Sequence, residues 1–226
     1  MIEVNSEKEL DDLLDALGRE IVSTRFYNDL YRDLVDSIEE FEREFNQSRT
    51  FWSLALDSLN DARLLRLCRI FDGNPKTLNL KTFLLAIQNN SGWFCAQSFR
   101  KRVSSNSFVE PLSKINRTPE PSQLNADIEI VSNDDPLVKK LTLWRNHIVA
   151  HKDPGVVLKK KKIIENNPIS ESEIHCLLER ALDVFNRYSQ LFRASIHSPT
   201  IVGKDDFEQM LRLVRLGIKN SDEMLS

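Results

Sequence analysis

Two side chains in the second half of the sequence, Arg145 and His151, have the types and spacing for chemistry on a phosphate. An arginine guanidinium is always charged and presents a planar fork of donors that matches phosphate oxygens. A histidine near a helix C-terminus holds a proton more readily and can transfer it near neutral pH. Spacing alone nevertheless favours a structural role, because an arginine can pair with one of the 34 acidic side chains and a histidine can cap carbonyls.

The helix that would carry both side chains is expected to begin at Pro136, with Asp135 as its N-cap. It should end near His151, because Asp153 precedes a proline and is disfavoured in the α conformation. At about 100° per residue, Arg145 lies roughly 75° to one side of an apolar stripe and His151 roughly 45° to the other. Both therefore border the face expected to be buried, whose stripe consists of Leu137, Leu141, Trp144 and Ile148.

Lysines cluster around this pair of side chains. Residues 136–162 carry eight basic side chains against one acidic one, whereas residues 1–48 carry five against 14. A locally basic field attracts a phosphate backbone, although a solvated basic face is the plainer explanation. If the segment binds RNA, we expect the contacts to come from Lys152, Lys159, Lys160, Lys161 and Lys162. For the four consecutive lysines a solvated loop is the more ordinary role.

Other combinations of reactive residue types are weaker. His147 and His151 stand four apart on one helical face, as two metal ligands would, but only Asp153 offers an acidic third ligand and no HExxH pattern is present. His175 and Cys176 diverge by about 100° on a helix, so they do not form a base and nucleophile, and Cys176 is expected to be a small buried side chain. We therefore expect no metal and no cofactor.

Two further patterns bear on nucleotide binding. Trp93 and Phe94 lie close to Arg100, Lys101 and Arg102, and this combination could stack nucleic-acid bases. Core aromatics beside a basic surface turn are the commoner arrangement. The six glycines form neither a GxGxxG loop nor a Walker loop, which excludes the usual nucleoside-triphosphate sites.

Apolar periodicity predicts helices through most of the first half of the sequence. Ser6 and Glu9 have the spacing of a capping box before the first helix, in which Gly18 is a candidate break. Further helices are expected over Thr50–Phe71 and Leu80–Gln88. Between them, an i, i+4 rhythm beside an acidic face indicates an amphipathic helix through Phe26, Leu30, Leu34, Ile38, Phe41 and Phe45.

The second half has one irregular segment and three helices. Residues 101–135 are rich in Ser, Asn and Pro, so we expect an irregular or mobile insertion before the helix from Pro136. Ser170 and Glu173 cap the next helix, whose apolar stripe is Ile174, Leu178, Ala181, Phe185, Tyr188 and Phe192. A last helix spans about 205–216, with Phe207, Met210, Leu211 and Val214 facing inward. Since no strand pattern of comparable length competes, the fold class expected is an all-α helical bundle.

Composition fits a single helical domain over residues 1–226. The hydrophobic content of 41% and charged content of 29% are those of an ordinary folded protein, which excludes a disordered or fibrous chain. Three cysteines without CxxC spacing fit a reducing compartment. The acidic N-terminus does not have the pattern of a secretory signal, and no long apolar run is present. We expect a cytoplasmic protein with no membrane contact.

The residues from Arg145 to His151 read RNHIVAH, with five residues between the arginine and the histidine. This segment resembles the R-x(4–6)-H signature of the HEPN (higher eukaryotes and prokaryotes nucleotide-binding) superfamily, in which a polar residue commonly follows the arginine. The position of the motif late in a helix, the Lys152 and Asp153 that follow it, and the sequence LCRIFDG over 67–73 resemble the abortive-infection U branch. The resemblance covers most of the chain.

The resemblance implies metal-independent RNA cleavage, in which the 2′-hydroxyl attacks the adjacent phosphate. Arg145 would then stabilise the charged phosphorane, His151 would transfer a proton, and Asn146 would orient the reacting groups. Family members usually build the site from two copies of the motif, so a homodimer is expected. An RNA substrate and an antitoxin or other regulatory protein would be the partners, in a phage-defence or toxin–antitoxin system.

Two alternatives stay open. Many HEPN proteins are catalytically silent modules that bind RNA, a nucleotide or a protein partner. A helical scaffold without any site is the third hypothesis.

Overall fold

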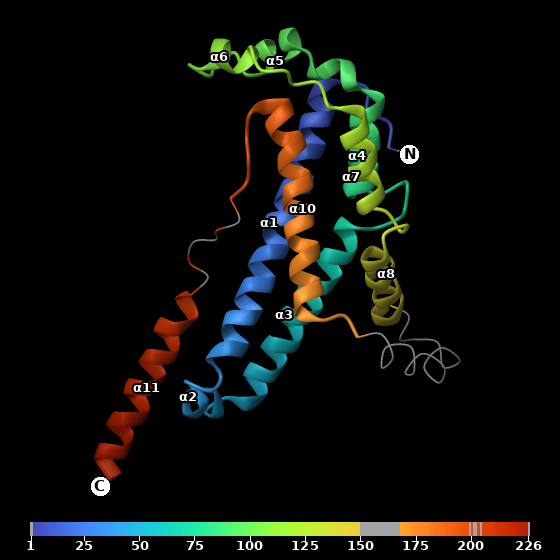
Figure 1. Cartoon of the computed structure of the whole chain (residues 1–226). Helices are drawn as coiled ribbons and strands as arrows, with labels where there is room; N and C mark the ends of the chain where they lie inside the picture. Colours follow the sequence, from blue (N-terminus) through green and yellow to red (C-terminus); the bar gives the residue numbers. More distant parts are fainter. Residues whose placement is uncertain (1, 150–167, 199, 201–202, 204, 226) are drawn as a thin grey trace. The chain divides into compact units, whose positions relative to one another are not determined.

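The computed structural model describes residues 2–149, 168–198, 200, 203 and 205–225, and this part of the chain contains helices and no strand (Figure 1). The predicted all-α class is therefore confirmed. None of the described helices has the length and apolar content to cross a membrane. The helices are α1 (Glu7–Ser37), α2 (Glu42–Asn46), α3 (Arg49–Ile70), α4 (Leu80–Asn89), the 3-10 helix η1 (Ser91–Phe94), α5 (Ala96–Arg102), α6 (Val109–Ser113), α7 (Pro121–Ile130), α8 (Pro136–Val149), α10 (Glu171–Arg193) and α11 (Asp206–Leu225).

Contacts divide the chain into two compact units. The first unit comprises residues Met1–Val22 and Arg66–His197, and the second comprises Ser23–Leu65 and Ser198–Ser226. Helices α1 and α3 contribute residues to both. The single domain expected from the sequence stays a prediction.

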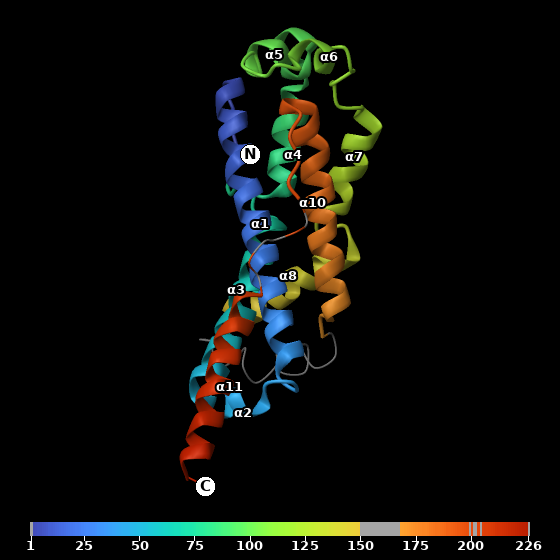
Figure 2. The same ribbon diagram turned by 90° about the vertical axis from the view of Figure 1, so that its left-hand side faces the viewer.

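Helix α10 is the central core element of the first unit. Ser170 accepts a hydrogen bond from the backbone of Glu173, and Glu173 accepts one from the backbone of Ser170, so the predicted capping box is present. Every residue of the predicted apolar stripe is buried: Ile174, Leu178, Ala181, Phe185, Tyr188 and Phe192. Helices α5 and α8 contact α10, and α4 packs along α7 (Figures 1 and 2).

The segment 101–135 is less irregular than its composition predicts. It contains α6 and α7, because Pro111 is accommodated within a helix of five residues and Pro121 occupies the first turn of α7, where its missing N–H costs nothing. Two arginines tie this segment to the end of α10: Arg102 donates to the carbonyl of Phe192 and Arg117 to that of Gln190. Figure 2 shows α5 and α6 crossing this end of α10.

Helix α1 runs through Gly18 without a break, contrary to the sequence-based expectation. Glycine is required there by packing. A Cβ atom at this position would approach the Phe185 ring to 2.8 Å and the His197 ring to 3.2 Å. The residue therefore permits close helix packing rather than marking a helix end.

The second unit has its own small core of Leu34, Phe41, Phe45 and Leu211. The helix expected to continue through Phe45 ends at Ser37, and the chain turns before α2, which leaves Ile38 38% exposed. Helix α11 is longer than predicted. Its Leu211 is buried, but Met210 is 46% exposed and does not face inward, because Leu211 and Phe207, four residues apart, occupy the face that packs on the core.

Candidate functional site

The start of α8 is fixed by Asp135, as the sequence predicts. Its Oδ1 atom accepts hydrogen bonds from the N–H groups of Leu137 (2.9 Å) and Val138 (3.0 Å). The same atom lies 2.9 Å from Nη1 of Arg180 on α10. Burial raises the pKa of Asp135, but the hydrogen bond from the Val138 N–H and the interaction with Arg180 outweigh it, so that the pKa lies below its usual value. Asp135 thus both caps α8 and attaches it to α10.

The buried face of α8 is displaced by one residue from the predicted stripe. Val138 and Leu141 are buried, whereas Leu137 and Trp144 are only half-buried. Two ion pairs attach α8 to α10: besides Asp135 with Arg180, Lys140 Nζ lies 2.7 Å from the carboxylate of Glu173. Arg145 follows Leu141 by one helical turn and is half-buried, so it lies at the edge of the buried face of α8.

Arg145 forms an ion pair with Asp72, the residue that follows α3 by two positions. The side chain of Arg145 is 34% exposed and that of Asp72 is 17% exposed. The pair therefore lies at the protein surface with one side open to solvent. A phosphate group is small enough to reach a guanidinium from such an open side, where Arg145 presents charge-assisted donors.

Asp72 is held by the turn in which it lies. Its Oδ1 atom accepts from the N–H of Asn74 (3.3 Å), and its Oδ2 atom accepts from the hydroxyl of Thr77 (3.1 Å). The turn ends at Asn79, which caps α4 by accepting from the N–H of Thr82 (2.9 Å) and donates to the carbonyl of Asn74 (3.0 Å). The turn between α3 and α4 is consequently a hydrogen-bonded unit, and Asp72 is its contact with α8.

A second contact joins the same turn to α8. Gly73 packs against Asn133, since a Cβ atom there would lie 2.6 Å from the side-chain nitrogen of Asn133. The Oδ1 atom of Asn133 accepts a hydrogen bond from the hydroxyl of Thr142 on α8 (2.9 Å). The sequence motif over 67–73 thus ends against the helix that carries Arg145. Sequence reasoning singled out this motif but did not identify Asp72 as the partner of Arg145.

The cysteines near this site differ in environment. Cys68 on α3 is buried, with its sulfur 4.0 Å from the carbonyl oxygen of Leu141, and burial raises the pKa of its thiol to about 12. Such a thiol stays protonated and unreactive at neutral pH. Cys176, predicted to be buried, is exposed on α10. The prediction was wrong because Cys176 lies outside the apolar stripe of that helix, whose buried members include Leu177 and Leu178.

The remaining predicted site residues fall outside the described part of the chain. These are His151, the lysines expected to contact RNA (Lys152, Lys159, Lys160, Lys161 and Lys162), and the side chains of Asn146 and His147. The backbone of Asn146 belongs to α8. Of the predicted catalytic set, the structure describes the surroundings of Arg145 alone.

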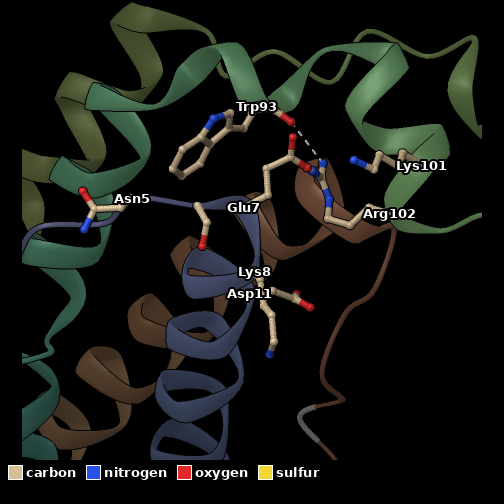
Figure 3. A pocket seen from close by; sticks show the side chains of 8 residues that line it. Asn5, Glu7, Lys8, Asp11, Trp93, Lys101 and Arg102 are labelled. Atoms are coloured by element: carbon tan, nitrogen blue, oxygen red, sulfur yellow. Dashed lines mark hydrogen bonds and ion pairs between the residues drawn. The ribbon is translucent and has the colours of Figure 1, made fainter.

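A cavity of about 560 Å³ lies in the first unit between the start of α1 and α5. Figure 3 shows the Trp93 ring above the first turn of α1 and the Arg102 guanidinium beside the carboxylate of Glu7. Arg102 also donates to the carbonyl oxygens of Trp93 (3.2 Å) and Phe192 (3.0 Å). Its charge is paired within the protein, so its contacts are those of a structural residue.

Phe94 belongs to the core as well, and its ring packs 5.2 Å from that of Phe192. Of the two aromatic residues, Phe94 therefore belongs to the core, whereas Trp93 is half-buried and lines the cavity with Lys101 and Arg102.

Comparison with known protein families matches residues 7–210 to the family described as AbiU2, a HEPN family. The match begins with the first residue of α1 and includes Asp72, Arg145 and His151. No curated protein and no solved structure matches the chain.

Proposed function

Because the chain belongs to the AbiU2 family of HEPN proteins, we propose that it is a metal-independent endoribonuclease of a phage-defence or toxin–antitoxin system. The observation that carries this proposal is the position of Arg145. Its side chain pairs with Asp72 and is one-third exposed. Part of the Arg145 side chain is therefore accessible to a phosphate, whereas the buried Arg117 donates to backbone carbonyls inside the protein.

In the proposed reaction, the RNA 2′-hydroxyl attacks the adjacent phosphorus and the 5′-oxygen of the next nucleotide leaves. Arg145 stabilises the extra negative charge of the phosphorane with charge-assisted hydrogen bonds. His151 transfers a proton to or from the reacting oxygens, and Asn146 orients them. The lysines at 152 and 159–162 attract the phosphate backbone.

We further propose that the working enzyme is a homodimer, in which two copies of the Arg and His motif form a composite site. A closed dimer with twofold symmetry brings the same segment of both chains together. An antitoxin or another regulatory protein would then control the activity by covering that seam or the basic segment. The protein would act in the cytoplasm, where its RNA substrate is present.

The test is an RNA cleavage assay in EDTA with structured RNAs such as tRNA. We expect cleavage by the wild-type chain and at least about a 100-fold loss with Arg145→Ala or His151→Ala. The matched control is Arg49→Ala on α3, an exposed arginine that bonds only to the nearby Asn46 among the described residues. Cleavage by all variants alike would identify a contaminating nuclease and would remove the proposal.

A catalytically silent module is the second candidate, and one observation favours it. The charge of Arg145 is already balanced by Asp72, as in a structural ion pair. A silent module would bind RNA without cutting it in the same assay, and its affinity would fall steeply with salt. Failure to bind RNA at any salt concentration would instead favour a scaffold.

A further inference from the structure

We propose that Asp72 is a positioning residue of this site, which sets the direction of the Arg145 guanidinium and lowers the attraction of the free site for phosphate. This inference rests on the proposed function and extends it to a residue outside the R-x(4–6)-H motif. The two residues are separated by 73 positions in sequence and meet through the packing of α8 beside the end of α3.

The location of Asp72 is electrostatically unfavourable without Arg145. The carboxylate lies just past the C-terminus of α3, where the helix dipole is negative and a second negative charge is disfavoured. A cation at that point stabilises both the helix end and the carboxylate. The turn from 72 to 79 therefore depends on Arg145 as much as Arg145 depends on the turn.

The carboxylate can orient the guanidinium because it is itself fixed. Its Oδ1 atom contacts both Arg145 and the N–H of Asn74, and its Oδ2 atom contacts the Thr77 hydroxyl. A contact to each oxygen prevents rotation of the carboxylate plane. An arginine side chain loses considerable rotamer entropy when it becomes ordered. Because its fixed partner already orders Arg145 in the free protein, this entropy is not lost again when RNA binds.

The contact between Asp72 and Arg145 favours catalysis by orienting the guanidinium, but it weakens the binding of RNA. A negative charge beside Arg145 offsets part of the positive charge that attracts phosphate. Removing the carboxylate charge should therefore strengthen or preserve RNA binding while it weakens catalysis. A residue with a purely structural role would not produce this split, because unfolding lowers binding and turnover together.

The experiment compares Asp72→Asn, Asp72→Glu and Thr77→Val with the wild type in single-turnover cleavage of tRNA in EDTA. The control is Asp61→Asn, since Asp61 is an exposed carboxylate on α3, the helix that precedes Asp72. We expect Asp72→Asn to lower the cleavage rate about 10- to 100-fold, because misplacement by about 1 Å can have this effect. Asp72→Glu should restore part of the loss, and Thr77→Val should cause a smaller one.

Binding is measured separately with a 2′-O-methyl form of the same RNA, which cannot be cut by 2′-hydroxyl attack. Asp72→Asn should bind it at least as tightly as the wild type, whereas Arg145→Ala should bind it more weakly. Equal loss of affinity in both variants would overturn the positioning role, as would an unchanged cleavage rate in Asp72→Asn. Should Asp72→Asn fold poorly, Thr77→Val tests the orienting role alone, because it releases the carboxylate and leaves its charge in place. A lower cleavage rate with unchanged RNA affinity would support that role, and a wild-type rate would overturn it.

The two proposals fail in different ways. If Arg145→Ala cleaves as fast as the wild type, the proposed function is wrong whatever Asp72 does. If Arg145→Ala is inactive but Asp72→Asn keeps the wild-type rate, only the positioning role is wrong.

Discussion

Asp72 and Arg145 form an ion pair between the turn after α3 and helix α8, two segments brought together by the fold of the first unit. The carboxylate has further partners in its own turn, the Asn74 N–H and the Thr77 hydroxyl. The contact ties the motif-bearing helix to a rigid turn. Other contacts of the fold also lead to measurable predictions.

Arg117 should contribute strongly to stability. It is buried, its guanidinium lies 3.7 Å from the centre of the Phe99 ring, and it donates to the carbonyls of Leu112 (2.9 Å) and Gln190 (2.7 Å). Arg117→Lys keeps the charge but loses the planar guanidinium and its hydrogen bonds. Urea unfolding should therefore show a free energy of unfolding that is lower by about 2 kcal/mol. Arg100→Lys, at an exposed ion pair with Glu110, should change stability by less than about 0.5 kcal/mol. Equal effects of the two substitutions would contradict this role.

Asp127 should be costly to remove, because it is a buried carboxylate with several donors around it. It is buried on α7, accepts from the Tyr188 hydroxyl (2.7 Å) and the Gln123 amide (3.0 Å), and pairs with Arg187. Asp127→Ala leaves these donors without their acceptor and should lower the free energy of unfolding by about 3 kcal/mol or more. Asp183→Ala, an exposed carboxylate on α10, is the control. If Asp127→Ala lowered the free energy of unfolding as little as the control does, Asp127 would not have this stabilising role.

Gly18 and Gly217 should respond in opposite directions to alanine. Both lie within helices, but a Cβ atom at Gly18 would meet the buried Phe185 ring and the half-buried His197 ring, whereas no atom lies within 4 Å of a Cβ at Gly217. Gly18→Ala should destabilise by about 1–3 kcal/mol through overpacking. Gly217→Ala should stabilise by up to about 1 kcal/mol through helix propensity. Thermal unfolding measures both changes, and a stabilising Gly18→Ala would refute the packing role.

Stability should decline in mild acid because of His197. Burial, together with the nearby charge of Arg193, lowers the pKa of His197, and Asp15 opposes this shift only in part. The unfolded chain then takes up a proton at higher pH than the folded chain. The contribution of neutral His197 to the free energy of unfolding is complete above about pH 6.5. It is lost as the pH falls from there toward the lower pKa of His197 in the folded state.

The check is urea unfolding of the wild type and His197→Gln at pH 7.5 and pH 5.5. The wild type should lose more stability between these two conditions than the variant does. An identical loss in both proteins would assign the effect to other groups.

The helices were predictable because their signals are local. The capping box of Ser170 and Glu173 and the apolar stripe of α10 involve residues within a few helical turns, and the structure confirms both. The start of α8 at Pro136 follows from an equally local cap. For α10, the period of the apolar residues was sufficient to identify the buried face of the helix.

Tertiary packing decided the features that sequence reasoning missed. On α8 the described buried residues are Val138 and Leu141, and Arg145, one turn after Leu141, pairs with Asp72. An ion pair across 73 residues leaves no local pattern, and any acidic side chain was an equal candidate. The inward placement of Met210 was wrong because α11 has two adjacent apolar faces. The local pattern does not say which of them packs on the core.

The measurement that most directly tests the proposed chemistry is the identity of the RNA ends after cleavage in EDTA. Attack by the 2′-hydroxyl at a site built on Arg145 and His151 predicts a 2′,3′-cyclic phosphate on one product and a 5′-hydroxyl on the other. Mass spectrometry of the products distinguishes these ends, and a substrate with a 2′-deoxy nucleotide at the cleaved position should resist the protein. Products with 3′-hydroxyl and 5′-phosphate ends, or equal cleavage of the deoxy substrate, would contradict the account.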